Sequence, residues 1–368
     1  MSIDGLPCRC LLSMSDVHNF IQSCMIAVGT KPNHAKDLAD VLVDGDNKGH
    51  LSHGLNRLDM YVNDIKSGIC AKEGEPVISK STVATTLVDG KNLLGPVVGN
   101  FCMKLAISKA KDVGIGWVVA HGSNHFGVAS YYSMQALNHK FIGMSYTNTS
   151  PLVVATRAKE CTLGTNPISV AAPAKDKNNF VLDMATSAVA LGKVELQHRR
   201  GEKMPLGWGS NAEGKASNDP AEILNGGGLL PIGGLETTGG YKGYGLAMMV
   251  EVFCGILSGS HYSKHIRAWK SQTGQIADLG QCFVAIDPGC FASGFEERMA
   301  DLLNIHRNLE PSVPGQAVLT AGDPEREHMA KCSKYGGIPY PINVINFMNS
   351  MAKELGVTLL RTDRTVKP

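Results

Sequence analysis

A chain of 368 residues exceeds the usual size of one hydrophobic core, so we expect two lobes with a cleft between them. Its 35 Lys and Arg residues nearly balance 33 Asp and Glu, and no basic run is interleaved with aromatic residues, so neither nucleic acid nor an acidic membrane is an expected partner. The ten cysteines are scattered without any C-x-x-C pair, which predicts reduced thiols and favours the cytoplasm.

The N-terminal region has the pattern of a helical lobe. Residues 15–29 carry one apolar stripe at helical spacing, with Ser15 as the expected N-cap. A second helix is expected over residues 33–43. The composition then changes to β-branched residues over 76–90, which places the end of this lobe near residues 75–85.

The third helix of this lobe is expected to begin at Ser52-His53-Gly54-Leu55-Asn56-Arg57. With Ser52 as the N-cap, His53 and Arg57 would lie one turn apart on the same helix face. The positive end of the helix and the guanidinium both favour a neutral imidazole, which can take a proton from an alcohol near pH 7. Arg57 can hold a carboxylate through two parallel hydrogen bonds, so the pair suits a 2-hydroxy acid.

The central and C-terminal regions mix strands and helices. Short apolar runs predict buried strands, and amphipathic spacing predicts helices before and after them. The expected strands are 116–120, 142–146, 168–172, 180–182 and 281–286, and the expected helices are 99–113 and 342–355. The longest apolar run, 246–257, is about half the length that a bilayer crossing needs and contains Glu251, so we expect no membrane span.

Glycine placement bears on cofactor binding. The chain has 41 glycines, which crowd into residues 225–245, where a loop must turn sharply or approach another segment closely; a flexible hinge is the alternative. Neither G-x-G-x-x-G nor G-x-x-x-x-G-K-[ST] occurs, which disfavours a Rossmann domain and a P-loop. A dinucleotide would need amides and cations from other loops, and residues 164–167 and 239–243 are the candidates.

A second histidine, His125, follows an expected strand at a strand-to-helix turn, where active-site groups often gather. A structural or solvent-exposed role is the alternative. Together with His50, His53 and His121 it has the spacing of helical metal ligands. No carboxylate lies in either histidine motif, so we predict no metal.

Three further polar residues could take part in binding or catalysis. Asp183 ends an apolar strand, where a carboxylate can orient a histidine or bind a ribose hydroxyl; a helix N-cap is the alternative. Lys193 and Lys242 can each reach a phosphate or a carboxylate, although a solvated amine is the usual role of lysine.

Seven short motifs occur in order over nearly the whole chain. They are Ser52-His53-Gly54 with Arg57, Gly116-Trp117 leading to Ser123-Asn124-His125-Phe126-Gly127, Thr147-Asn148 before Pro151, Leu163-Gly164-Thr165-Asn166-Pro167, Asp183-Met184-Ala185-Thr186-Ser187, Gly192-Lys193, and Gly239-Gly240-Tyr241-Lys242-Gly243-Tyr244-Gly245. Together they closely resemble the malate/L-lactate dehydrogenase family, which includes ureidoglycolate dehydrogenase, sulfolactate dehydrogenase and 2,3-diketo-L-gulonate reductase.

This resemblance implies a mixed α+β fold and a homodimer. Both chain ends, residues 1–80 with 295–368, would form a helical domain. The central residues 81–294 would form a sheet domain that binds a nicotinamide cofactor without a Rossmann fold, in agreement with the missing glycine fingerprint.

The resemblance also assigns residues to roles. It gives proton transfer to His53 and His125 and places Arg57 at the substrate carboxylate; we add Asp183 to the expected catalytic set. The implied cofactor contacts are Thr149, Phe180, Val181, Leu182, Asp183, Met184, Ala185, Tyr241, Lys242, Gly322, Asp323 and Pro324. Residue 121 is His where relatives often carry Arg or Asn. The loop at Gly322 reads Ala-Gly-Asp-Pro-Glu where many relatives have Pro-Gly-Glu, a change at the adenosine end of the cofactor, so NADP is the alternative to NAD.

We therefore predict a cytoplasmic dehydrogenase that oxidises (S)-malate, or another small 2-hydroxy acid, to the 2-oxo acid with NAD. The alternatives are a reductase of cyclic imino acids or keto sugars on the same scaffold, a metal-dependent hydrolase or lyase, and a non-catalytic small-molecule binder. The combination of His53, Arg57, His125 and Asp183 argues against a binder, because a binder has little need for a tunable base beside a carboxylate clamp.

Overall fold

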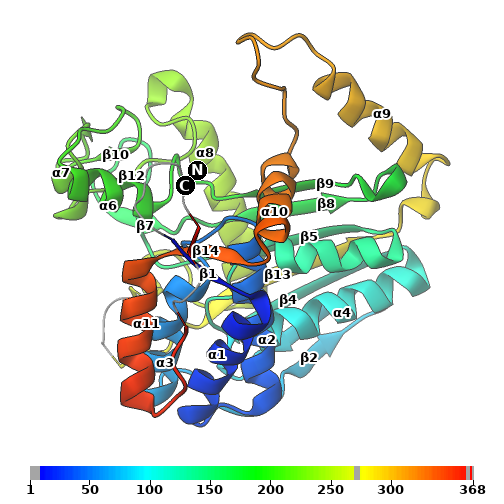
Figure 1. Cartoon of the computed structure of the whole chain (residues 1–368). Helices are drawn as coiled ribbons and strands as arrows, with labels where there is room; N and C mark the ends of the chain where they lie inside the picture. The colour runs from blue at the N-terminus through cyan, green and yellow to red at the C-terminus, as the bar shows by residue number, and fades with distance from the viewer. Residues whose placement is uncertain (1–8, 269–273, 362–364, 367–368) are drawn as a thin grey trace.

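A seven-stranded mixed sheet forms the centre of the computed structural model, which describes residues 9–268, 274–361 and 365–366 (Figure 1). In sheet order the strands are β2 (Val77–Ser81), β3 (Thr85–Asp89), β4 (Ile115–Ser123), β13 (Leu279–Ile286), β5 (Ile142–Thr147), β8 (Ile168–Ala172) and β9 (Phe180–Met184). The β3–β4 pair is parallel and the other five neighbouring pairs are antiparallel. A Rossmann sheet is parallel, so the prediction against that fold is confirmed.

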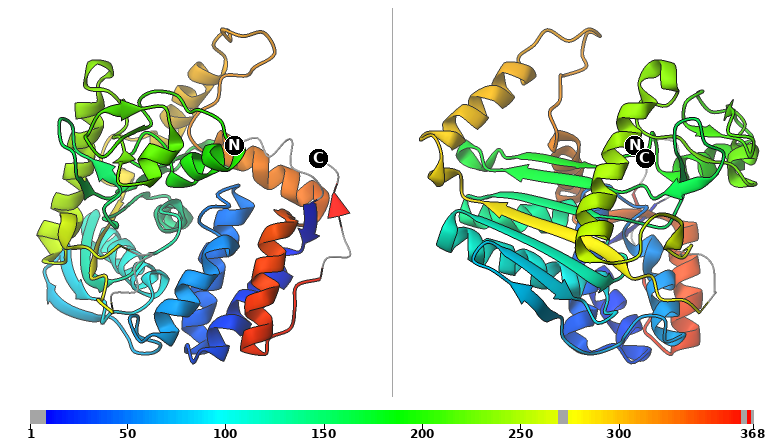
Figure 2. Two further views of the ribbon diagram at one scale, coloured as in Figure 1. Left: turned by 90° about the vertical axis from the view of Figure 1, so that its left-hand side faces the viewer. Right: turned by 180° about the vertical axis from the view of Figure 1, so that it is seen from behind.

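Helices cover both faces of this sheet. The helix α4 (Gly95–Val113) packs on β4 and β13, while α5 (Ser130–Ser133) and η2 (Met134–His139) pack on β5 and β8. On the other face lie α8 (Gly240–Glu251) and the π-helical turn η5 (Val252–Ile256), which Figure 2 shows crossing the sheet in its right-hand view. Since β13 is covered on both sides, nearly all its residues are buried, which explains its continuous apolar run.

The two ends of the chain meet in a group of helices beside the sheet. The N-terminal members are α1 (Met14–Ala27), α2 (Pro32–Asn47) and α3 (Leu58–Lys66), and the C-terminal members are α10 (Asp323–Tyr335) and α11 (Ile342–Leu355). A small sheet links the ends, since β1 (Arg9–Leu12) lies between β14 (Ile338–Pro341) and β15 (Thr365–Val366). Figure 2 shows the blue and red helices side by side in its left-hand view.

One hydrophobic core joins these helices to the central sheet. It includes Leu42 of α2, Leu58 of α3, Phe283 of β13 and Met348 of α11, all fully buried. The helix α9 (Phe295–Arg307) lies elsewhere, beside η3 (Lys175–Lys177) at the far end of β8 and β9 (Figure 1).

A satellite unit packs around its own smaller core, which includes Val194 and Leu229. Its strands, in sheet order, are β11 (Ala216–Ser217), β10 (Gly209–Ser210), β12 (Gly228–Leu229), β6 (Val153–Val154) and β7 (Cys161–Leu163). Its helices are α6 (Leu191–Arg200) and α7 (Pro220–Leu224). Three further short 3₁₀ turns are η4 (Glu236–Thr238), η6 (Ser263–His265) and η7 (Pro288–Cys290).

Local expectations hold best where the sequence pattern is most regular. The strand at Ile168–Ala172 and the helix at Ile342–Leu355 have the predicted bounds. The predicted Ser15 cap is wrong, because α1 begins two residues earlier and Ser13 accepts the hydrogen bond from the Asp16 amide at 3.0 Å. Both α2 and α4 are longer than predicted, and each has a proline in its first turn.

The glycine-rich segment before α8 is closely packed. A Cβ on Gly240 would lie 2.0 Å from the Gly234 carbonyl oxygen, and one on Gly243 would lie 2.2 Å from that of Ile232. These positions require glycine because the helix lies directly against the preceding loop. The expectation of a close approach is therefore confirmed.

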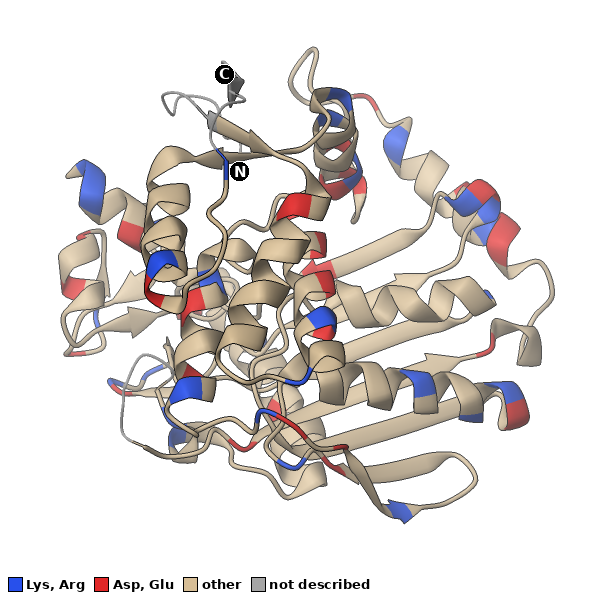
Figure 3. Cartoon of the chain, turned by 60° about the horizontal axis from the view of Figure 1, so that its bottom comes forward, with Lys and Arg blue, Asp and Glu red and all other residues tan. Residues whose placement is uncertain are grey.

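The surface carries both signs of charge. On the face shown in Figure 3, Lys and Arg are interspersed with Asp and Glu along the helices. Within the described part of the chain, no helix is both long and apolar enough to cross a bilayer.

Candidate active site

The segment from Ser52 to Arg57 does not form the first turn of a regular helix. A single 3₁₀ turn, η1 (Leu55–Arg57), precedes α3, and Ser52 lies in the turns before it. The predicted Ser52 cap is therefore wrong. Its hydroxyl is instead 2.9 Å from Nδ1 of His53, and its carbonyl oxygen accepts a hydrogen bond from Nε of Arg57 at 2.6 Å.

A buried carboxylate supports this turn in place of a serine cap. One oxygen of Asp46, near the end of α2, accepts hydrogen bonds from the Leu55 amide at 2.8 Å and the Tyr340 hydroxyl at 2.7 Å. A Cβ on Gly54 would lie 1.9 Å from the other oxygen, so the turn rests directly on the carboxylate. Burial raises the pKa of Asp46 to about 7, despite the two hydrogen bonds that lower it. Through Tyr340, the C-terminal strand β14 also supports the turn.

His53 and His125 meet as a stacked pair. Their ring centroids are 5.9 Å apart, and their planes are inclined by 22°. The Tyr61 hydroxyl of α3 is 2.6 Å from Nδ1 of His125, and the Gly127 amide donates to the same nitrogen at 3.3 Å. These contacts orient the ring. Tyr61 was not among the residues predicted from the sequence, although its position four residues after Arg57 places both on one face of a helix.

Both imidazoles of the pair have lowered pKa values. Burial lowers the pKa of His53 to about 4, and the positive charges of Arg57 and His50 act in the same direction. Burial, followed by the charges of His53 and Arg57, holds the pKa of His125 well below 6.5. The expected influence of Arg57 on its neighbour is confirmed, but burial is the larger cause. Both rings are therefore neutral near pH 7.

Arg57 lies in the wall of a groove of about 770 Å³ that runs along α3. The lining from α6 and α11 comprises Glu195, Arg199 and Phe347. Because Nε of Arg57 donates to the backbone, the Nη end of the guanidinium is the part that can meet a carboxylate. The groove is large enough for a small acid.

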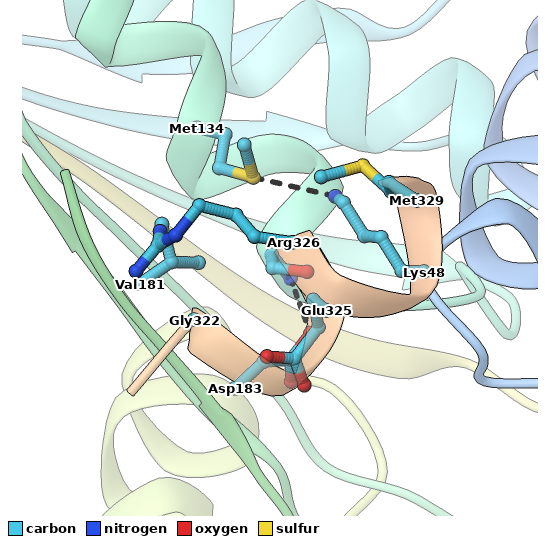
Figure 4. A pocket seen from close by; sticks show the side chains of 9 residues that line it. Lys48, Met134, Val181, Asp183, Gly322, Glu325, Arg326 and Met329 are labelled. Atoms are coloured by element: carbon cyan, nitrogen blue, oxygen red, sulfur yellow. Dashed lines mark hydrogen bonds between the residues drawn. The ribbon is translucent and has the colours of Figure 1, made fainter. Parts of the chain in front are cut away.

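Asp183 lies within β9 and not at a helix N-terminus, so the N-cap alternative is wrong. Its carboxylate accepts a hydrogen bond from the Ser130 amide at 2.7 Å. With the buried Lys48 and Glu325 it lines a cavity of about 30 Å³, which admits water but no substrate (Figure 4). Burial raises the pKa of Asp183, and the charge of His50 is the largest opposing influence.

The structure brings together two segments that the resemblance assigns to the cofactor, β9 and the loop before α10. The Val181 amide donates to the Ala321 carbonyl at 3.2 Å. Gly322 has a φ of 98°, and a Cβ there would lie 3.2 Å from the Val181 side chain. Glycine is required here both for the backbone angle and for the close approach to β9.

The Asp323 carboxylate forms hydrogen bonds with residues of its own C-terminal region. It receives hydrogen bonds from Arg307 at 2.8 and 2.9 Å and from the Thr320 amide at 2.7 Å. Burial raises its pKa, but these bonds and one from Arg326 outweigh burial and hold it well below the usual range. The side chain of Asp323 therefore anchors α10.

The other implied cofactor residues lie around the start of α8 and the loop after β5. The Thr165 amide donates to the Thr149 hydroxyl at 2.9 Å. Tyr241 is 53% exposed in the first turn of α8, and Nζ of Lys242 is 5.9 Å from its ring centroid. Helix amides, a cation and an aromatic ring can hold a phosphate and a planar ring. This set of groups fits a dinucleotide.

Other candidates do not join either cluster. Lys193 is half-buried in α6. In the described residues, no three His, Cys, Asp or Glu side chains converge so as to hold a metal ion. The nine cysteines that the structure describes are free thiols, as predicted, and Cys8 lies outside the described residues.

Comparison with known proteins agrees with this arrangement. The family model for malate/L-lactate dehydrogenases matches residues 12–349. The chain belongs to this family. It is 39% identical over 345 residues to the malate dehydrogenase of Pyrococcus abyssi, covering 93% of this chain and 94% of that protein. The ureidoglycolate dehydrogenase (NAD(+)) of Escherichia coli K12 is 30% identical, with 83% and 85% covered.

The fold comparison leads to the same family. The structure of malate dehydrogenase from Pyrococcus horikoshii OT3 superposes with a TM-score of 0.88 at 36% identity, covering 96% of this chain and 97% of the other. The predicted family and mixed α/β fold are therefore confirmed. The chain is a dehydrogenase of 2-hydroxy acids, and its partner is a small-molecule acid.

Proposed function

We propose that this dehydrogenase oxidises (S)-malate to oxaloacetate with NAD, as a homodimer in the cytoplasm. The observation that carries the proposal is the stacked, neutral pair of His53 and His125, with Arg57, whose charge acts on both rings, in the wall of the groove along α3. The malate dehydrogenases among similar proteins support malate as the substrate. The ureidoglycolate dehydrogenase named for NAD(+) supports that cofactor.

The histidine pair serves as the base. In the oxidation direction, the hydroxyl on C2 of the substrate loses its proton to one neutral ring. The lowered pKa values keep both rings able to accept a proton at neutral pH. The substrate loses one hydroxyl proton per turnover, and a charge on His53 lowers the pKa of His125, which disfavours a second proton on the pair. Tyr61 holds His125 in position for this transfer.

The remaining groups position the substrate and the cofactor. The Nη end of Arg57 holds the carboxylate next to C2, which orients the hydroxyl. When bound, the nicotinamide supplies the hydride acceptor. Thr149, the β9 residues 180–184 with Ala185, the loop 322–324, Tyr241 and Lys242 would hold the cofactor; Asp183 is placed to support β9 through Ser130.

The test is reduced-nicotinamide absorbance, followed with purified protein, NADH or NADPH, and a panel of 2-oxo acids. Consumption with oxaloacetate supports malate and identifies the cofactor. Turnover with another 2-oxo acid only would overturn malate but keep the reaction class. No turnover, with cofactor still bound, would favour the ureido or imino acids that some relatives use. Sedimentation at equilibrium tests the dimer.

A further inference from the structure

A buried carboxylate links three segments of the cofactor region. Glu251 lies in the last turn of α8, within an otherwise apolar run, and is almost fully buried. Its Oε1 accepts a hydrogen bond from Nδ2 of Asn166 at 3.1 Å, and its Oε2 accepts one from Nδ2 of Asn148 at 3.2 Å. The two asparagines come from different loops, so one side chain connects both loops to the helix.

Backbone groups fix the orientation of the Asn166 amide. Its Oδ1 accepts a hydrogen bond from the Thr149 amide at 3.1 Å, while its Nδ2 also donates to the Ala247 carbonyl at 3.1 Å. A flipped amide would place its NH2 group against the donor N–H of Thr149, and its oxygen against two acceptors, the Ala247 carbonyl and the Glu251 carboxylate. Asn166 therefore has to present an N–H group to Glu251.

The Asn148 amide is fixed in the same way. Its Oδ1 accepts a hydrogen bond from the Gly280 amide at 2.9 Å, and its Nδ2 also donates to the His261 carbonyl at 2.9 Å. Two fixed donors thus face residue 251 from opposite loops. Only a side chain that accepts at two positions, an ionised carboxylate, satisfies both.

We propose that Glu251 is a positioning residue of the cofactor site, which sets the Thr149 loop against the helix that carries Tyr241 and Lys242. The inference rests on the proposed use of these three residues by the nicotinamide cofactor. Glu251 itself is buried at the other end of α8 from Tyr241 and Lys242. Its influence on the cofactor passes through Asn166 to the Thr149 amide and along α8.

The test is Glu251→Gln, which keeps the shape of the side chain but offers one acceptor and one donor. The new donor would face an asparagine N–H group, so one buried donor would be left unpaired. We expect the Kd for NADH, measured by nicotinamide fluorescence, to rise about tenfold or more. We expect kcat at saturating NADH to stay near the wild-type value, because no hydrogen bond among the described residues joins His53, His125 or Arg57 to this network.

Two further variants keep the test decisive. Glu251→Asp keeps the carboxylate but reaches at most one asparagine, so a smaller rise in Kd is expected; it replaces the Gln variant if that variant does not fold. Glu296 lies on α9 and forms an ion pair with Lys140 at the surface. Glu296→Gln makes the same chemical change there, and should leave the Kd for NADH unchanged.

The outcomes separate this inference from the proposed function. An unchanged Kd in a folded Glu251 variant overturns the inference, as does a lower bound fraction with the same Kd, which shows a structural role alone. A wild-type protein that binds neither NADH nor NADPH overturns the proposed cofactor, and the inference with it.

Discussion

Each half of the site rests on one buried carboxylate, but the two are used differently. Beneath the His53 turn, Asp46 accepts both of its hydrogen bonds at one oxygen, and its other oxygen has no hydrogen-bond partner among the described residues. Beneath the cofactor loops, Glu251 accepts at both oxygens. An amide can replace a carboxylate that accepts at one oxygen, but not one that must accept at two. The same substitution should therefore have opposite outcomes in the two halves.

The two halves also differ in the chemistry they carry. The histidine half is built from α2, α3, the loop after β4 and the C-terminal strand β14, and it holds the groups proposed to move a proton. The cofactor half is built from the middle of the chain and α10, and it holds the groups proposed to bind the cofactor. Changes in the first should act on kcat and the substrate, and changes in the second on the Kd for the cofactor.

The largest effect is expected from His53→Ala and His125→Ala. Loss of a proton acceptor should lower kcat by roughly 10² to 10⁴ while the Kd for NADH stays unchanged. Steady-state kinetics with oxaloacetate and fluorescence titration measure the two quantities. His139→Ala, at an exposed histidine, is the control. Full turnover in either variant would show that its histidine is structural.

Arg57→Ala should act mainly on the substrate. Loss of a two-bonded contact with a carboxylate should raise the KM for oxaloacetate by about 30-fold or more. Arg57→Lys keeps the charge without the planar guanidinium, so its KM should lie between those of Arg57→Ala and the wild type. A KM that does not change in the alanine variant removes Arg57 from the substrate site.

The Asp46 turn offers the direct comparison with Glu251. Asp46→Asn keeps an acceptor for Leu55 and Tyr340, so kcat/KM should stay within about twofold of the wild type. Asp46→Leu leaves the Leu55 amide unpaired, and a shift of the turn should lower kcat/KM about tenfold. If the Asn and Leu variants are equally impaired, hydrogen bonding to this carboxylate does not position the turn.

The next expected effect is the pH dependence of stability at Asp46. Its pKa of about 7 in the folded chain exceeds its ordinary value of 3.8, so the folded state binds a proton that the unfolded state releases between these values. That contribution to stability is present at low pH and is lost as pH rises through 7. In urea denaturation from pH 4.5 to 7, the free energy of unfolding of Asp46→Asn should increase relative to that of the wild type by up to about 1.4 kcal/mol per pH unit. Parallel pH curves for the two proteins would contradict the raised pKa.

The His53 ring should show the opposite slope in the same experiment. Its pKa is lowered from 6.5 to about 4, so the unfolded state binds the extra proton between these values. Its contribution is complete above pH 6.5 and is lost as pH falls toward 4. In the wild type, the opposite pH slopes from Asp46 and His53 partly cancel. Asp46→Asn removes the first, so the stability of this variant should rise more steeply with pH.

Local pattern determined much of the fold and part of the site. Alternation and helical spacing depend on neighbouring residues alone, so the strand at Ile168–Ala172 and the helix at Ile342–Leu355 could be read from the sequence. Residue chemistry pointed to an imidazole and a guanidinium acting on a 2-hydroxy acid at His53 and Arg57. Motif order then identified the family, whose match covers residues 12–349.

Only the tertiary structure decided what holds these groups in place. Tyr61 meets His125 across 64 residues, and Tyr340 meets Asp46 across 294. Glu251 was noted only as a charge that interrupts an apolar run, and the structure shows it bonded to Asn148 and Asn166. Such pairings depend on which distant surfaces are buried together, and burial is also the main cause of the shifted pKa values. Sequence therefore determined the reactive groups, while long-range packing decided their partners and their protonation.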